Sequence, residues 1–246
     1  MLVEPIDSAN RTDSKVAEKT EVGFSAGELS IKTNKPGDRN GSVAITIELP
    51  AGSGLVLNTA WTEVHAEGRF GDCALDMASG QVRLDHVTAL RGRLRAGEVT
   101  VGRLAGSARI DGGAAGVRIG EAEGIVRYTG STGKVWIGHA WSDVDLGGAS
   151  GGFDIDRADG SVTAKAGACP IRVGRMSRGK ADLANASGGI EIGISEGTAA
   201  RVDAESTKGR VRDSLPAQDG PGGFDDEVEV YARTRLDDIV IHPAAG

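Results

Sequence analysis

The segment VRIGEAEGIVRYTGSTGKVWI (residues 117–137) contains one complete unit of the repeat that decides the fold. It starts with the triplet Val-Arg-Ile at Val117 and ends with the equivalent triplet Val-Trp-Ile at Val135. Further triplets of this kind begin at positions 82, 99, 153, 171 and 190, so the step along the chain is nearly constant. Units too short to bury their own apolar side chains normally stack and share one continuous core.

Each unit also contains a second apolar alternation, such as Val126/Tyr128 or Val144/Leu146, and Gly-rich corners such as residues 112–116. Side chains that alternate with period two point to one face of a strand. The sequence therefore predicts an all-β fold: a single-stranded parallel β-solenoid with coils of about 18 residues. The handedness rule for parallel crossovers favours a right-handed coil. An antiparallel β-sandwich is the alternative, but it does not explain the fixed step.

The regions outside the repeat suggest a division of the chain into four parts. We expect an N-terminal β segment and cap in residues 1–67, with no more than a weak strand in the polar residues 1–20. The solenoid repeats occupy residues 68–213, and a Pro- and Gly-containing loop follows in residues 214–226. Two strands in residues 227–246 are expected to cap the open end, because an exposed strand edge invites association.

Charge and cysteine content restrict the function classes. The net charge is −7, so there is no basic excess of the kind that binds nucleic acid. No signal peptide or run of eighteen apolar residues is visible, which predicts a cytoplasmic protein with no membrane partner. Cys73 and Cys169 lie about five repeats apart, too far for a disulfide in a solenoid, and unpaired cysteines fit a reducing compartment.

Three motifs resemble functional sites but depart from them. Residues 130–134 (Gly-Ser-Thr-Gly-Lys) lack the first glycine and the final Ser or Thr of a phosphate-binding loop. Residues 147–156 lack the regularly placed Asp of calcium-binding repeats. His139, Ser142 and Asp143 are close in sequence, but nothing near them indicates an oxyanion hole. We predict no catalytic, cofactor-binding or metal-binding residue, although the aspartates at 143, 145, 154, 156 and 159 form an acidic cluster.

The outward positions of the repeat carry a candidate binding face. Arg91, Arg109 and Arg127 should stack on one face of the solenoid, with Arg83 and Arg118 on the neighbouring face. Trp136 should point outward as well. Arginine together with an exposed Trp is a common binding combination, although a solvated ladder is the simpler interpretation. Trp61 and Trp141 are interpreted as packing residues.

Several motifs together resemble a known family. They are residues 47–53 (Ile-Glu-Leu-Pro-Ala-Gly-Ser), 67–73, 135–138, 194–200, 219–221 and 234–241. In these stretches the chain is similar to the actinobacterial branch of a β-strand-repeat adhesin family, a domain of unknown function, and the similarity covers almost the whole chain. The resemblance implies a β-solenoid-like fold and carries over no catalytic residue. "Adhesin" is in this case a label derived from shape.

These observations favour a non-enzymatic interaction scaffold that binds a protein partner or a second copy of itself. Self-association is expected through the strand edge at residues 42–49. A carbohydrate-active β-helix with acids or bases converging in a surface groove is one alternative. A binder of small anions at the arginine face is another, and salt should weaken its binding.

Overall fold

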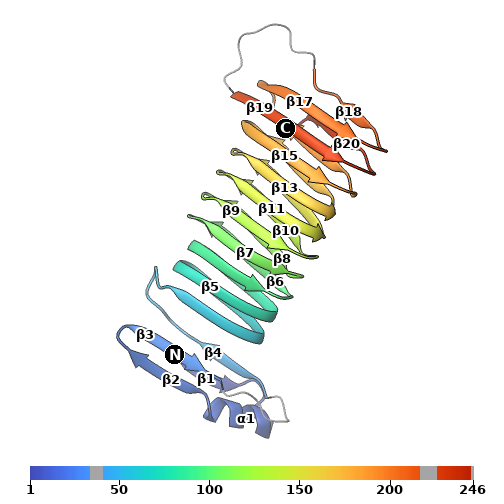
Figure 1. Ribbon diagram of the computed structural model, residues 1–246. Helices are drawn as coiled ribbons and strands as arrows, with labels where there is room; N and C mark the ends of the chain where they lie inside the picture. The colour runs from blue at the N-terminus through green and yellow to red at the C-terminus, as the bar shows by residue number, and fades with distance from the viewer. Residues whose placement is uncertain (34–40, 217–225, 245–246) are drawn as a thin grey trace. The chain divides into compact units, whose positions relative to one another are not determined.

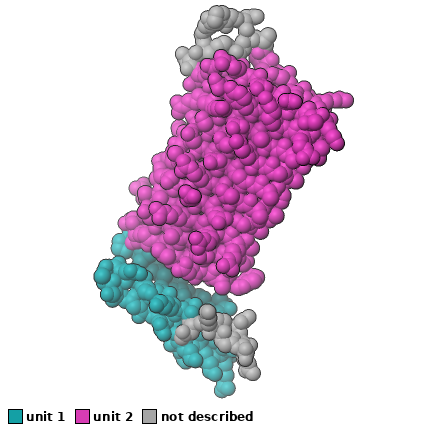
Figure 2. All heavy atoms as spheres, in the orientation of Figure 1, with its two compact units in different colours: residues 1–50 teal, residues 51–246 magenta. Residues whose placement is uncertain are grey.

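The computed structural model describes residues 1–33, 41–216 and 226–244, so most of the loop expected at 214–226 lies outside the described residues. The chain forms two compact units, Met1–Pro50 and Ala51–Gly246, which Figure 2 shows in different colours. None of the helices in the described residues has the length and apolar character needed to cross a membrane.

The first unit contains two small antiparallel sheets and one helix. Strand β1 (Leu2–Pro5) pairs with β4 (Val43–Thr46), and β2 (Glu21–Ser25) pairs with β3 (Glu28–Lys32). Strand β1 agrees with the weak strand expected in residues 1–20, but helix α1 (Arg11–Glu18) in the same stretch was not predicted. The Asn10 side chain accepts a hydrogen bond from the Thr12 N–H at 2.9 Å, which caps the helix N-terminus.

The second unit is a solenoid formed by one 16-stranded sheet (Figure 1). Its long first strand, β5 (Leu55–Leu94), pairs with β6 and with β7 and so joins two walls. The odd wall consists of β7 (Ala108–Gly113), β9 (Val126–Gly130), β11 (Val144–Ser150), β13 (Val162–Ala168), β15 (Gly179–Asn185), β19 (Asp226–Thr234) and β17 (Thr198–Ser206). The even wall consists of β6 (Glu98–Leu104), β8 (Gly116–Ala122), β10 (Lys134–Ala140), β12 (Gly152–Ala158), β14 (Ile171–Met176), β16 (Ile190–Ile194), β20 (Ile239–Pro243) and β18 (Val211–Asp213).

The strands of both walls run parallel and in register. On the even wall Val117 pairs with Val135, Val135 with Phe153 and Phe153 with Ile171, so equivalent positions lie over one another. These four side chains are each at most 2% exposed and belong to the common core. The prediction of a parallel solenoid with a regular repeat step is confirmed, and the antiparallel sandwich is excluded because the pairs of this sheet are parallel.

Backbone hydrogen bonds connect the corners of successive coils as well as their strands. The Trp141 N–H donates to the Ala122 carbonyl at 2.9 Å, and the Asp159 N–H donates to the Ala140 carbonyl at 2.8 Å. Gly151 shows why corners require glycine: its φ is +121°, and a Cβ there would collide with the Gly133 carbonyl oxygen.

The last two coils are exchanged relative to their order in the sequence. Strand β19 lies between β15 and β17, and β20 lies between β16 and β18. The strands of residues 227–246 therefore do not cap the end as expected; β17 and β18 form the edge instead. Val228, Val230, Ile239 and Ile241 are each 0% exposed, and their strands have a coil on either side. Strand β17 alternates apolar with charged residues and so tolerates the edge position.

The stacked core makes a strong prediction for Val135, which is 1% exposed. Replacing Val135 with Asp should destabilise the solenoid by about 4 kcal/mol or more, because it buries a carboxylate that has no partner. Thermal unfolding followed by circular dichroism should show a large loss of stability. Lys134→Asp, on the same strand but at an exposed position, is the control and should change stability little. Equal stability of both variants would contradict the stacked core.

Candidate anion-binding face

The outer face of the odd wall carries three arginines in register, which we call the arginine ladder: Arg91, Arg109 and Arg127. Arg91 pairs with Arg109 across β5 and β7, and Arg109 pairs with Arg127 across β7 and β9. All three are exposed. Neighbouring strands lie ~4.8 Å apart, so the parallel register places three like charges on adjacent strands. Their mutual repulsion is unfavourable.

The ladder lies in a groove of about 650 Å³ on the odd wall. Val56 and Ala74 line one end of the groove, and Asp145 lies at the other end, directly after Arg127 in the register. In the part of the chain that the structure describes, no guanidinium of the ladder forms a hydrogen bond or an ion pair. Three exposed cations of this kind form a site that an anion would stabilise.

Two further carboxylates line the groove without neutralising the ladder. Asp76 lies 3.9 Å from the Nη1 of Arg93, an arginine beside the ladder. Asp111 follows Arg109 on β7, and within the described residues it forms no ion pair with a ladder arginine. These acids lower the positive potential of the groove, but they leave the three ladder guanidinium groups open to a ligand.

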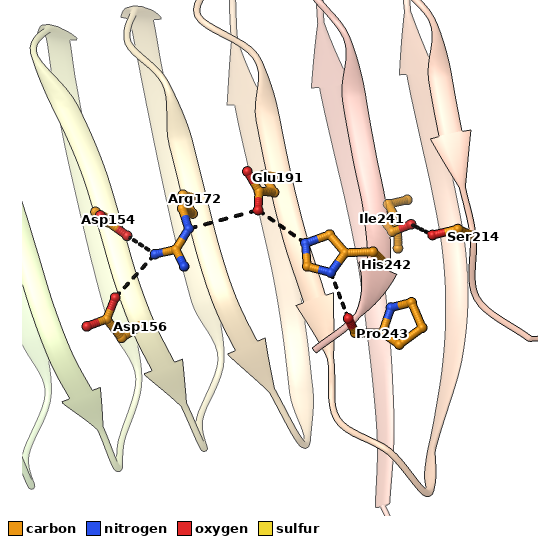
Figure 3. A network of polar contacts seen from close by, with 8 residues as sticks. All are labelled: Asp154, Asp156, Arg172, Glu191, Ser214, Ile241, His242 and Pro243. Carbon is orange, nitrogen blue, oxygen red and sulfur yellow. Dashed lines mark hydrogen bonds and ion pairs between the residues drawn. The ribbon is translucent and has the colours of Figure 1, made fainter. Parts of the chain in front are cut away.

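An arginine on the even wall shows how the same fold neutralises a cation elsewhere (Figure 3). Arg172 donates from one terminal nitrogen to Asp154 at 2.7 Å and to Asp156 at 3.2 Å. Its Nε lies 3.9 Å from a Glu191 oxygen, which also contacts His242 Nε2 at 3.2 Å. The hydrogen bond to Asp154 is the main cause of the raised pKa of Arg172. The guanidinium is thus surrounded by carboxylates that the ladder arginines lack.

Arg118 and Trp136, the other two candidate face residues, lie on the even wall. They are register partners on β8 and β10, and the Arg118 Cζ is 4.7 Å from the centroid of the Trp136 ring. Trp136 is only partly exposed, and its ring lies over Gly138. The structure thus divides the five candidate residues between two faces, with the ladder on one and the Arg118–Trp136 pair on the other.

The corner after β10 brings together a different set of residues from the one that its sequence suggests. His139 Nε2 lies 2.7 Å from Asp159 Oδ2, whereas the Ser142 hydroxyl donates to the Glu123 carbonyl and Asp143 accepts from the Ser161 N–H. Asp159 comes from the next coil, so only the repeat step could have suggested this pair.

Asp159 connects three successive coils. It also accepts hydrogen bonds from Arg157 at 3.2 Å and from the Ser177 hydroxyl at 2.8 Å. Burial acts to raise the pKa of Asp159, but the hydrogen bonds from His139, Arg157 and Ser177 lower it below its ordinary value. Every strong acceptor position of this buried carboxylate is therefore directed at a structural partner, which makes it a stabilising group.

Two tryptophans interpreted as packing residues are in fact exposed. Trp61 is 84% exposed, and Trp141 is 49% exposed with its ring centroid 4.0 Å from that of His139. Trp61 follows the polar Asn58 and Thr59 in the first coil, where no earlier coil of the second unit covers it.

The aspartate cluster expected from the sequence does not converge. Asp143 and Asp145 belong to the odd side of a coil, whereas Asp154 and Asp156 belong to β12 on the even wall. Within the described ranges, no group of three or more His, Cys, Asp or Glu residues is arranged to hold a metal ion.

Both cysteines are free and buried, in agreement with the expectation that no disulfide joins them. Burial raises the pKa of Cys73 and of Cys169 to about 11. At neutral pH both are therefore protonated thiols that pack as small apolar groups.

The fold and the face define a β-solenoid repeat protein with a charged outer wall. A family model described as Toastrack DUF4097 matches residues 12–221, and the chain belongs to this family. It is a domain of unknown function with a repeated β fold. The β-repeat fold and the unknown function both agree with the resemblance described from the sequence. The actinobacterial branch and the adhesin label stay predictions. No curated protein and no solved structure matches the chain.

The Asp159 network makes stability depend on pH. Because the pKa of Asp159 is lower in the folded protein than its ordinary 3.8, its contribution is fully present above that value and is lost as the pH falls below it. Wild type should therefore lose thermal stability below about pH 4 more steeply than Asp159→Asn, which should already be less stable at pH 7. Melting followed by circular dichroism between pH 7 and pH 2.5 measures both effects, with Glu98→Gln, an exposed site, as control.

Proposed function

We propose that this protein is a non-enzymatic interaction scaffold that binds an acidic segment of a partner protein through the odd wall. The observation that carries the proposal is the arginine ladder: three exposed guanidinium groups in register with no carboxylate partner in the described chain. Two buried free cysteines support a reducing location, and we propose that the scaffold acts in the cytoplasm.

The chemistry of the ladder suits carboxylates. A guanidinium can donate two parallel hydrogen bonds to one carboxylate. The stacked strands place three guanidinium-bearing residues at a spacing of ~4.8 Å. An extended acidic segment can therefore place carboxylates between neighbouring arginines. Asp145 at one end and the apolar Val56 and Ala74 at the other limit the length that such a segment can occupy.

The two alternatives from the sequence have less support. A carbohydrate-active groove would need free acids that converge, but Arg172 binds Asp154 and Asp156 on the even wall. A binder of small anions would use the same ladder. The two alternatives differ in the number of arginines that bind one ligand, which is larger for an acidic segment than for a small anion.

The proposal predicts binding of a fluorescein-labelled hexaglutamate peptide, measured by fluorescence anisotropy. Arg109→Ala should weaken binding about tenfold, the equivalent of ~1.4 kcal/mol for one charged contact. Binding should also weaken as salt is raised from 50 to 300 mM, because exposed charges are screened.

Arg83→Ala is the matched control, since Arg83 is an exposed arginine on the other side of the solenoid. It should leave the affinity unchanged. Displacement of the peptide by equimolar sulfate would indicate a site for small anions. An affinity that neither Arg109→Ala nor salt alters would overturn the proposal.

A further inference from the structure

The odd wall is positive over one half and acidic over the other. Following the register from β5 to β15, the column that begins with the ladder reads Arg91, Arg109, Arg127, Asp145, Thr163, Asp182. The sign of the charge changes between β9 and β11. Within the described residues Asp145 has no ion-pair partner, and Asp182 forms one ion pair, with Lys165 at 3.5 Å.

The neighbouring column, two residues further along each strand, has an acid on the ladder side of this change and a lysine on the other side. It reads Arg93, Asp111, Thr129, Gly147, Lys165, Ala184. Asp111 thus lies two strands before the change between β9 and β11, and Lys165 lies two strands after it. Each column contains opposite charges at equal distances from the same line.

From this pattern we propose that the partner of the odd wall is a second copy of this chain. The two copies pack their odd walls face to face about a two-fold axis that runs parallel to the strands, between β9 and β11. Such an axis reverses the order of the strands and leaves each column facing itself. The inference rests on the proposed function, because it uses the same face and identifies the acidic partner.

The symmetry then pairs opposite charges in both columns. Arg127 faces Asp145 of the second copy, Arg91 faces Asp182 of the second copy, and Asp111 faces Lys165 of the second copy. Arg109 faces Thr163, and Arg93 faces Ala184, so no like charges oppose each other in these two columns. Packed sheets lie ~10 Å apart, a gap that an Arg and an Asp reaching from opposite sides can bridge.

Other arrangements of two odd walls do not give this result. An axis along the solenoid would keep the strand order and bring the ladder of one copy against that of the other. Within one chain Arg91 and Asp182 are separated by five strand steps, about 24 Å, so they cannot pair with each other. If a charge change at one of these two residues is compensated by the opposite change at the other, the contact must be between two copies, as in the two-fold dimer.

A charge exchange between Arg91 and Asp182 tests the dimer, with mass in solution measured by sedimentation velocity over a range of concentrations. Wild type should form a dimer. Arg91→Asp and Asp182→Arg should each weaken the dimer about tenfold or more. Because the contact occurs twice in the symmetric dimer, each change places like charges opposite one another at two positions. An equimolar mixture of the two variants should dimerise again, since every contact in the mixed dimer joins opposite charges. The chain carrying both changes should also dimerise.

Arg83→Asp is the matched control, because it makes the same charge change on the even wall and should leave the dimer intact. Far-UV circular dichroism checks that each variant keeps its β structure. A wild-type monomer at all concentrations would overturn this inference, as would single variants that the mixture does not rescue. A dimer that Ile45→Lys abolishes but Arg91→Asp leaves unchanged would also overturn the inference, because such a dimer forms through the edge of β4. If hexaglutamate still binds a monomer through Arg109, the proposed function stands and only the second copy is wrong.

Discussion

The structure depends on one constraint, the in-register hydrogen bonding of parallel strands from coil to coil. It places each residue ~4.8 Å from the equivalent residue of the next coil. Inside, this produces continuous columns such as Val99, Val117 and Val135, each at most 1% exposed. Outside, the same register stacks polar side chains whether or not their charges agree. The core and the charged face are thus two consequences of one geometry.

Because the register is imposed by the backbone, the placement of charge becomes informative. A single chain can relieve the stacking of like charges by alternating their signs, as it does where Arg172 lies between Asp154 and Glu191 on the even wall. The ladder lacks this alternation over three strands. The unfavourable repulsion is tolerated because the side chains are solvated, and an external anion would remove it.

The repeat step in the sequence predicts the columns but not the ends. A regular step identifies which residues share a column, so the positions of Val135 and of the ladder followed from the sequence. Helix α1 was missed because its signals, Asn10 as cap and Asp13 in the first turn, are short and lie in a polar stretch. The exchange of the last coils was missed because periodicity fixes register and not order. Strands β19 and β20 carry Val228, Val230, Ile239 and Ile241, which are fully buried between two coils, whereas the edge strand β17 has charged residues at alternate positions.

The acidic half of the odd wall is partly neutralised by ion pairs within the chain, whereas the three ladder arginines form none in the described residues. Lys165 contacts Asp182 at 3.5 Å, Arg233 contacts Asp203 at 2.8 Å, and the Lys180 ammonium lies 4.3 Å from the Tyr231 ring centroid. The ladder end therefore carries the larger free charge and is the end at which salt acts most strongly. In the two-fold dimer, Lys165 and Asp182 of one copy lie opposite Asp111 and Arg91 of the other. An ion pair that already exists in the monomer then becomes part of a four-residue network, so little side-chain freedom remains to be lost when the copies associate.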